Sequence, residues 1–126
     1  MIENGCTLWI PFWLPAGLNG PNGLMRGAWQ KRKKEKEKIL LMVLQDGGDK
    51  LRAPVPCRIV WTRYYCGTPM DLTNAAASFK HLEDVLVKLE VLVDDSPKYV
   101  RELVVRQVRV KSRISVGCRV DFETVM

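Results

Sequence analysis

The segment 114–123 alternates apolar residues with others at every second position, and this pattern constrains the fold more than any other in the chain. Its apolar set is Ile114, Val116, Cys118, Val120 and Phe122. Such alternation indicates a β-strand with one buried face and one face toward solvent. A strand of this kind needs a sheet whose apolar face is covered by other elements. The rest of the chain must therefore supply further strands and the helices that pack on them.

Earlier segments supply these elements in order. Residues 7–13 and 55–66 are rich in apolar and aromatic side chains and are predicted as strands. A helix is predicted over 24–45, with a basic first half and an apolar second half at 39–44 that we expect to be buried. The core-facing stripe of a second helix is Phe79, Leu82, Leu86 and Leu89. Two strands close the chain. We predict one α+β domain over residues 1–126, ordered β-α-β-α-β-β, with helices packed on one mixed sheet.

Charge and cysteine content narrow the class of partner. The chain has 20 Lys and Arg against 14 Asp and Glu, and this net charge of +6 favours polyanionic partners. Four cysteines without a Cys-x-x-Cys spacing, and His81 as the only histidine, make a zinc site unexpected. With no secretory signal and no apolar run of about 20 residues, we expect free thiols in a reducing cytoplasm and no membrane partner.

Aromatic residues and the histidine are predicted to be mainly structural. Trp9, Trp13 and Trp61 fall on strand patterns and are expected in the core. Trp29 and Tyr99 lie beside basic or acidic segments and could instead stack on unpaired bases. A lone histidine such as His81 is more often structural or solvated than a catalytic base.

Basic residues gather in the first predicted helix. They are Arg26, Lys31, Arg32, Lys33, Lys34, Lys36 and Lys38. Glu35 and Glu37 lie four residues after Lys31 and Lys33, so part of this run could be a self-paired, solvated face. Further basic residues elsewhere in the chain are Arg58, Arg63, Arg101, Arg106, Arg109, Lys111 and Arg113. Together they favour a continuous phosphate-binding surface, which would position nucleic acid without reading its sequence.

Acidic residues flank the second helix. Asp71 precedes it and the pair Asp94–Asp95 follows it, while Lys80 and Asp84 lie four residues apart within it. Each has an ordinary explanation: an N-cap, a turn and a solvated ion pair. Carboxylates at both ends of a helix in a basic chain also suggest a metal site, with Lys80 placed to offset phosphate charge.

Taken together, these motifs resemble a known family. The run D-L-T-N-x5-K-x3-D-x-L-V from Asp71, followed by DDSPKYV from Asp94, is similar to the RusA-type Holliday junction resolvases and their phage relatives. The resemblance extends to the loop 14–23 with Asn19 and to the basic helix after it. It implies a small homodimeric nuclease of a bacterial host, phage or prophage, which uses Mg²⁺, or alternatively Mn²⁺, to cut four-way DNA junctions in recombination and repair.

The resemblance also implies roles for individual residues. Asp71, Asp95 and the weaker candidate Asp94 would hold the metal ion, and Asp71, Asp95 and Lys80 would be catalytic. Lys80 would also contact DNA, together with Arg26, Lys31, Arg32, Lys33 and Lys34 of the basic helix. No small-molecule cofactor is implied.

Two positions depart from the family pattern. Thr73 stands where the family has a second acid of the opening motif, and a hydroxyl is a poorer ligand than a carboxylate for a hard cation. A protein of the same fold that binds branched DNA without cutting it is therefore the alternative function. Glu90 stands where relatives usually have a helix-ending glycine, and a left-handed conformation there would cost about 1–2 kcal/mol.

Chain length sets a condition on the metal site. A helix over 73–89 would run about 24 Å, whereas the six steps from Leu89 to Asp95 span at most about 20 Å. One chain therefore brings Asp95 back to Asp71 only if the helix ends early. Otherwise the two ends serve the site differently, or a dimer completes it. We expect the dimer to matter for the active surface.

Overall fold

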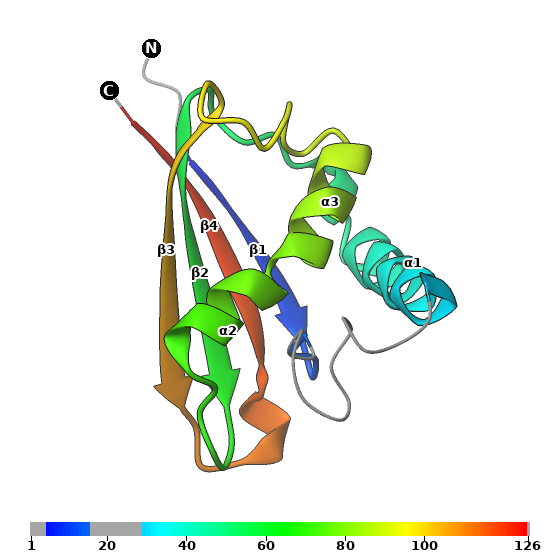
Figure 1. The fold of residues 1–126 in the computed structure, drawn as a ribbon, viewed down its shortest axis with the longest axis vertical. Helices are drawn as coiled ribbons and strands as arrows, with labels where there is room; N and C mark the ends of the chain where they lie inside the picture. Colours follow the sequence, from blue (N-terminus) through cyan, green and yellow to red (C-terminus); the bar gives the residue numbers. More distant parts are fainter. Residues whose placement is uncertain (1–4, 16–28, 126) are drawn as a thin grey trace.

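The protein forms a four-stranded mixed sheet with helices packed on it (Figure 1). The structure is a computed structural model and describes residues 5–15 and 29–125. Its elements are β1 (Cys6–Pro11), α1 (Trp29–Gln45), the 3-10 helix η1 (Gly48–Lys50), β2 (Cys57–Tyr65), α2 (Leu72–Ser78), α3 (Lys80–Lys88), β3 (Val100–Arg109), the 3-10 helix η2 (Arg113–Ser115) and β4 (Gly117–Thr124). The predicted α+β class with one mixed sheet is confirmed.

The sheet has the strand order β1-β4-β2-β3. β4 pairs antiparallel with both β1 and β2, and β3 pairs parallel with β2 at one edge of the sheet. The register places Trp61 of β2 opposite Val120 of β4 and Val105 of β3. The parallel pair requires a crossover connection, which α2 and α3 supply. The segment that carries the candidate acids is therefore this crossover.

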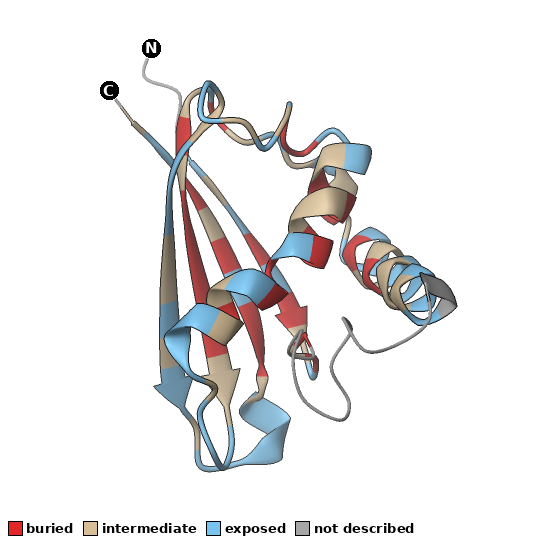
Figure 2. Ribbon diagram, in the orientation of Figure 1, coloured by how far each residue is buried: buried red, intermediate tan, exposed pale blue. Residues whose placement is uncertain are grey.

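The core lies between one face of the sheet and the helices (Figure 2). Phe79 and Leu86 of the crossover pack into the same buried cluster as Trp61 and Phe122 from the strands. The ring centroids of Trp61 and Phe79 are 5.0 Å apart, a favourable spacing for two aromatic side chains. The predicted stripe of the second helix is thus in the core, apart from Leu89, which is partly buried against it.

The predicted second helix is wrong in one respect, because it is two helices that meet at Phe79. Ser78 Oγ donates to the carbonyl of Ala75 at 2.7 Å, and the Phe79 amide bonds the carbonyl of Ala76 three residues back. Such a hydroxyl competes with the helical hydrogen-bond ladder and favours a bend. Thr73 and Lys80, which the sequence placed on one helix, therefore lie on two, α2 and α3.

Three predicted strand ends are also wrong. The strand predicted over 7–13 ends at Pro11, so Trp13 lies after it. The strand predicted from Val55 begins at Cys57, because Pro54 and Pro56 have no N–H to donate to a sheet. The strand predicted from Ile114 begins at Gly117. Ile114 lies in η2 and is 77% exposed; its amide donates to the hydroxyl of Ser112, which caps this short helix.

Burial differs from the prediction at two places. In α1, Ile39 and Val43 are buried, whereas Leu41 is 62% exposed, because only one side of this helix faces the core. Trp13 and Trp61 are in the core as predicted, but Trp9 is 40% exposed on the opposite face of the sheet, where it packs edge-on against Tyr64. The predicted helical residues 24–28 lie outside the described part of the chain.

The four cysteines are free thiols, as expected. Cys57 and Cys118 are buried, and burial raises the pKa of Cys57 to about 11 and that of Cys118 to about 12. Cys6 is partly buried and Cys66 is exposed. Among the described residues no helix has the length and apolar character needed to cross a membrane.

Candidate functional site

The chain reverses direction after α3 through a left-handed residue. Glu90 has a φ of 63°, and its amide donates to the carbonyl of Val87 at 3.0 Å. The amide of Val91 bonds the carbonyl of Leu86 at 2.9 Å. These two bonds form the Schellman motif that commonly ends a helix. The helix ends at Lys88, close to its predicted end, so the early end that one alternative required is not observed. The segment with Asp95 nevertheless returns, and it meets Lys80 at the start of α3 rather than Asp71.

Replacing Glu90 by glycine should stabilise the protein. A side chain in the left-handed region costs about 1–2 kcal/mol, and glycine lacks this penalty but loses more backbone entropy on folding. We expect Glu90→Gly to raise the free energy of unfolding by about 1 kcal/mol, measured by urea denaturation. Glu83→Gly, within α3, is the control and should destabilise. An unchanged or lower stability of Glu90→Gly would contradict this account of the turn.

Lys80 of α3 contacts the acidic segment that follows this helix. Its Nζ lies 2.6 Å from Asp95 Oδ2, 3.2 Å from Asp84 Oδ1 and 3.6 Å from Glu83 Oε1. The hydrogen bond to Asp95 raises the pKa of Lys80, and the same bond holds the pKa of Asp95 below its usual range. Both groups are therefore charged at neutral pH. The predicted i,i+4 pair of Lys80 and Asp84 is confirmed. Asp95, from the segment that follows α3, forms a further ion pair with Lys80.

Asp71 occupies a different position, at the N-terminus of α2. Its Oδ1 accepts a hydrogen bond from the amide of Asn74 at 2.9 Å, so it is the N-cap that one explanation predicted. The residue before it, Met70, is held by Gln107 of β3: the Met70 amide donates to Gln107 Oε1, and Gln107 Nε2 donates to the Met70 carbonyl. Gln107 thereby positions the start of α2 against the edge of the sheet.

Arg63 supports this arrangement from inside the protein. It is buried on β2, and its guanidinium donates to Gln107 Oε1 and lies over the ring of Trp61. Burial lowers the pKa of Arg63, although from a value high enough to leave the group charged. The prediction that Arg63 belongs to the basic surface is therefore wrong. It is buried because every second residue of β2, including Trp61 and Arg63, points from the sheet toward the helices.

The acids implied by the resemblance do not form one metal site within the described residues. Asp95 is paired with Lys80 at the start of α3. Asp71 caps the start of α2, so the whole of this seven-residue helix lies between Asp71 and α3. Asp94 Oδ1 accepts a hydrogen bond from the amide of Asp95 at 2.8 Å. Across residues 5–15 and 29–125 no group of three or more His, Cys, Asp or Glu side chains is arranged to hold a metal ion. The described acids of a single chain are thus not arranged as the predicted site for the ion.

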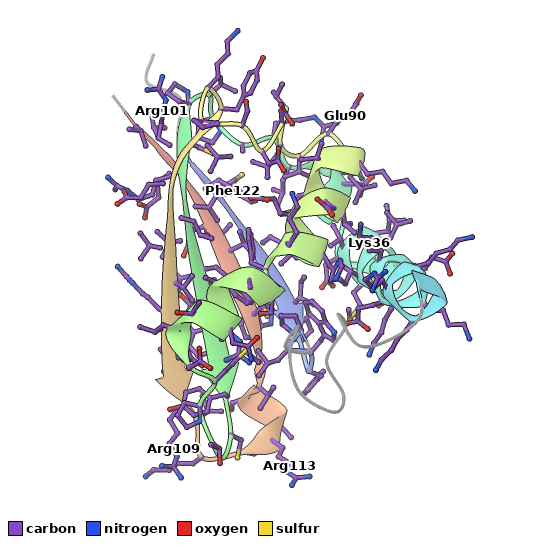
Figure 3. All side chains as sticks on the ribbon, in the orientation of Figure 1. Lys36, Glu90, Arg101, Arg109, Arg113 and Phe122 are labelled. Carbon is purple, nitrogen blue, oxygen red and sulfur yellow. The ribbon has the colours of Figure 1, made fainter. Side chains whose placement is uncertain are left out.

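The described basic residues occupy more than one region. Lys31, Lys33 and Lys34 of α1 are exposed and Arg32 is partly buried, whereas Arg26 lies outside the described residues. Figure 3 places Arg101 and Arg109 toward opposite ends of β3, with Arg113 near the end that carries Arg109. Lys36 of α1 reaches toward α3, where it pairs with Asp84, and Figure 3 places it apart from both ends of β3. The predicted basic residues are therefore spread over α1, β2, β3 and η2, and Arg58 of β2 is paired with Glu102 and Glu123.

A groove of about 540 Å³ separates α1 from α3. The two helices are bridged by Lys36 and Asp84, whose charged atoms are 2.9 Å apart. A second contact holds α1 to the segment after β1: Trp13 Nε1 donates to Glu35 Oε1 at 3.3 Å. Asp84 therefore contacts Lys36 through one oxygen and Lys80 through the other. Glu83, Asp84 and Asp95 together form an acidic cluster around Lys80. The Asp84 carboxylate connects the groove to this cluster.

His81 lies on the wall of this groove. Its side chain is buried, and neither ring nitrogen has a hydrogen-bond partner among the described residues. Burial, followed by the positive charge of Lys36, lowers the pKa of His81; Arg32 acts in the same direction, while Asp84 and Glu35 oppose it. The imidazole is therefore neutral at pH 7. The expectation of a structural histidine is compatible with its burial, but the unpaired nitrogens distinguish it from an ordinary core residue.

Burial of neutral His81 should make stability depend on pH. The unfolded chain binds a proton at this residue below about pH 6.5, where the folded chain does not. Stability should therefore fall as the pH is lowered from 7.5 to 5.5, about the range of histidine titration. The measurement is the urea midpoint of the parent and of His81→Gln at both pH values. We expect a smaller decrease for His81→Gln; equal decreases in the two proteins would contradict the lowered pKa.

Sequence reasoning missed three contributors to this region. Gln107 carried no signal, because its role depends on the register between β2 and β3. Lys36 was noted as one basic residue among several, and its pairing with Asp84 depends on how α1 packs against α3. The alternation along β2 was the one available signal for Arg63, since Ile59, Trp61 and Arg63 have the same parity.

Comparison with known proteins adds no relative: no protein-family model matches the chain, and no curated protein matches it.

Proposed function

We propose that this protein is a homodimeric, metal-dependent endonuclease of the RusA type that acts on branched DNA such as four-way junctions. The observation that carries the proposal is the network from Lys36 through Asp84 and Lys80 to Asp95. It links the cationic helix α1 to the acidic segment after α3. A nuclease needs this combination of positive charge for phosphate and carboxylates near it.

In this proposal Lys80 offsets the negative charge of the phosphate that is cut. Its ammonium is exposed, and it is held in place by Asp84 and Asp95. Basic residues of α1 bind the DNA backbone and orient it without sequence recognition. The acids in the described part of one chain are not grouped as a complete site for Mg²⁺ or Mn²⁺. In this proposal a second copy of the chain contributes acidic residues to each site.

The second candidate function is binding of branched DNA without cleavage. Two observations favour it: Thr73 replaces an acid of the family pattern, and the Asp71 carboxylate is engaged in capping α2. Thr73 is exposed in the first turn of α2, where an added carboxylate would interact favourably with the helix dipole. Thr73→Asp should therefore fold and could restore a missing ligand.

Junction binding and nicking separate these candidates. A labelled four-way junction is incubated with the parent protein and with Thr73→Asp, in Mg²⁺ and in Mn²⁺, with linear duplex of the same composition as the control substrate. Paired nicks by the parent support the nuclease. Tight binding without nicks, converted to nicking by Thr73→Asp, supports the second candidate. If neither protein prefers the junction to the duplex, both candidates fail.

Salt dependence tests the electrostatic part of the proposal. If about six basic side chains contact phosphates, the logarithm of the binding constant should fall with the logarithm of salt concentration at a slope of about −5. Replacing Lys33 and Lys34 by glutamine should make this slope shallower by about 2, because each lost contact contributes about one unit. Lys50→Gln, on η1, is the matched control and should leave the slope unchanged.

A further inference from the structure

The groove between α1 and α3 combines positive charge with a buried, unpaired imidazole. Four basic side chains line it, against two acidic ones, Glu37 and Asp84. The basic residues are Arg32, Lys33, Lys36 and Lys88. The groove therefore carries net positive charge with His81 neutral, which favours an anionic occupant.

His81 gives this groove a specific polar contact. The residue lines the groove but is only 8% exposed, and both ring nitrogens are covered, so a ligand reaches one of them only when a long side chain of the lining, such as that of Lys36 or Arg32, moves aside. An unpaired buried polar group costs about 1–3 kcal/mol, and a ligand that pairs with it removes this cost. Apolar side chains of Leu40 and Val85 also line the groove, and they reduce the access of water to the imidazole.

We propose that this groove is a phosphate-binding site in which His81 donates a hydrogen bond to a phosphate oxygen, with Lys36 and Lys88 supplying positive charge on either side. A phosphate group has the acceptor oxygens and the negative charge that this lining requires, and its size is well below the volume of the groove. The site stands independently of nuclease activity. Only its assignment to the DNA backbone rests on the proposed function.

Two sources of the phosphate are distinguishable, a phosphodiester of a DNA strand and a small phosphate compound. If DNA is the source, its strand would pass close to the cluster at Lys80, because Asp84 contacts both Lys36 and Lys80. The groove would then hold a backbone phosphate beside the one at Lys80. A small phosphate compound would bind without any DNA.

The single histidine makes the test direct. NMR of the imidazole nitrogens reports only His81, since the chain has no other histidine. The 126-residue chain is titrated with pyrophosphate and, separately, with a short single-stranded oligonucleotide, and sodium chloride of equal ionic strength is the reference. We expect a saturable change of the His81 resonances that sodium chloride does not produce, and a rise in the pKa of His81 on binding.

Variants test whether the groove is responsible. Lys88→Gln should weaken binding by about twofold to fivefold, the effect of removing one exposed charge. Lys50→Gln removes the same charge outside the groove and should have no effect on His81. Backbone spectra of each variant verify that it is folded. Equal weakening by both lysine substitutions would overturn the proposal, because it would indicate general charge attraction.

The titrations have four outcomes. A response to both ligands supports the site, a response to the oligonucleotide alone supports it with DNA as the source, and a response to pyrophosphate alone supports it with a small phosphate compound as the source. Unchanged His81 resonances with both ligands overturn the site. If fluorescence anisotropy shows that the oligonucleotide still binds in that last case, the proposed function survives although the groove site does not.

Discussion

Equal amounts of Asp71→Asn and Asp95→Asn subunits, mixed and allowed to exchange, should cut junctions that neither variant cuts alone. Each homodimer lacks a carboxylate in both of its sites. In a heterodimer whose sites are completed between subunits, one site has lost both carboxylates and the other retains both. With random exchange about half the dimers are heterodimers, so about a quarter of the parent number of intact sites should be recovered.

The basis of this prediction is the separation of the two acids within one chain. Asp95 is held by Lys80 at the start of α3, while Asp71 caps the opposite end of α2. If both acids instead served one site within a chain, every site of the mixture would lack one carboxylate and no activity would return. Measuring nicking before and after exchange, in the parent or Thr73→Asp background that cuts, distinguishes the two cases. A mixture of Asp71→Asn with Asp71→Ala subunits is the control and should stay inactive.

Phe79→Ala should produce the largest loss of stability among the single substitutions considered. Phe79 is 1% exposed, joins α2 to α3 and packs against Trp61. Removing a buried phenyl ring leaves a cavity and typically costs about 3–5 kcal/mol. The measurement is urea denaturation at neutral pH. Phe12→Ala removes the same group from a side chain that is 71% exposed, and we expect it to change stability by less than about 0.5 kcal/mol.

This substitution also bears on the site. Phe79 is the point at which the crossover bends, so the relative placement of Asp71 and Lys80 depends on it. A smaller residue there should disturb that placement as well as the core. If Phe79→Ala and Phe12→Ala have similar stabilities, the junction of α2 and α3 is not anchored by the core as the structure indicates.

Apolar periodicity was sufficient to predict the α+β class and most of the core, because burial of one face determines where apolar residues recur. Cys118, Val120 and Phe122 are buried on β4 as their alternation predicted. The division at Phe79 was not predictable in the same way, since the spacing of Phe79, Leu82 and Leu86 is satisfied by one helix or by two. It depends on a local hydrogen bond of Ser78, which no periodicity reports.

The candidate site was predictable where its contacts are local in sequence. The cap at Asp71 and the pair of Lys80 and Asp84 follow from spacings of three and four residues. The pairing of Lys80 with Asp95 was not predicted, because it depends on the left-handed turn at Glu90, and turns set the direction of the chain beyond them. The same limit applies to the pair of Lys36 and Asp84, which requires the packing angle of two helices.

The unequal burial of the four thiols has a practical consequence for studying the protein. Cys66 is exposed just after β2, whereas Cys57 and Cys118 are buried with raised pKa values and should react slowly with maleimides. A fluorophore could therefore be attached preferentially beside the segment that leads into α2. Energy transfer between two such labels would report subunit exchange directly, without altering any residue of the acidic cluster.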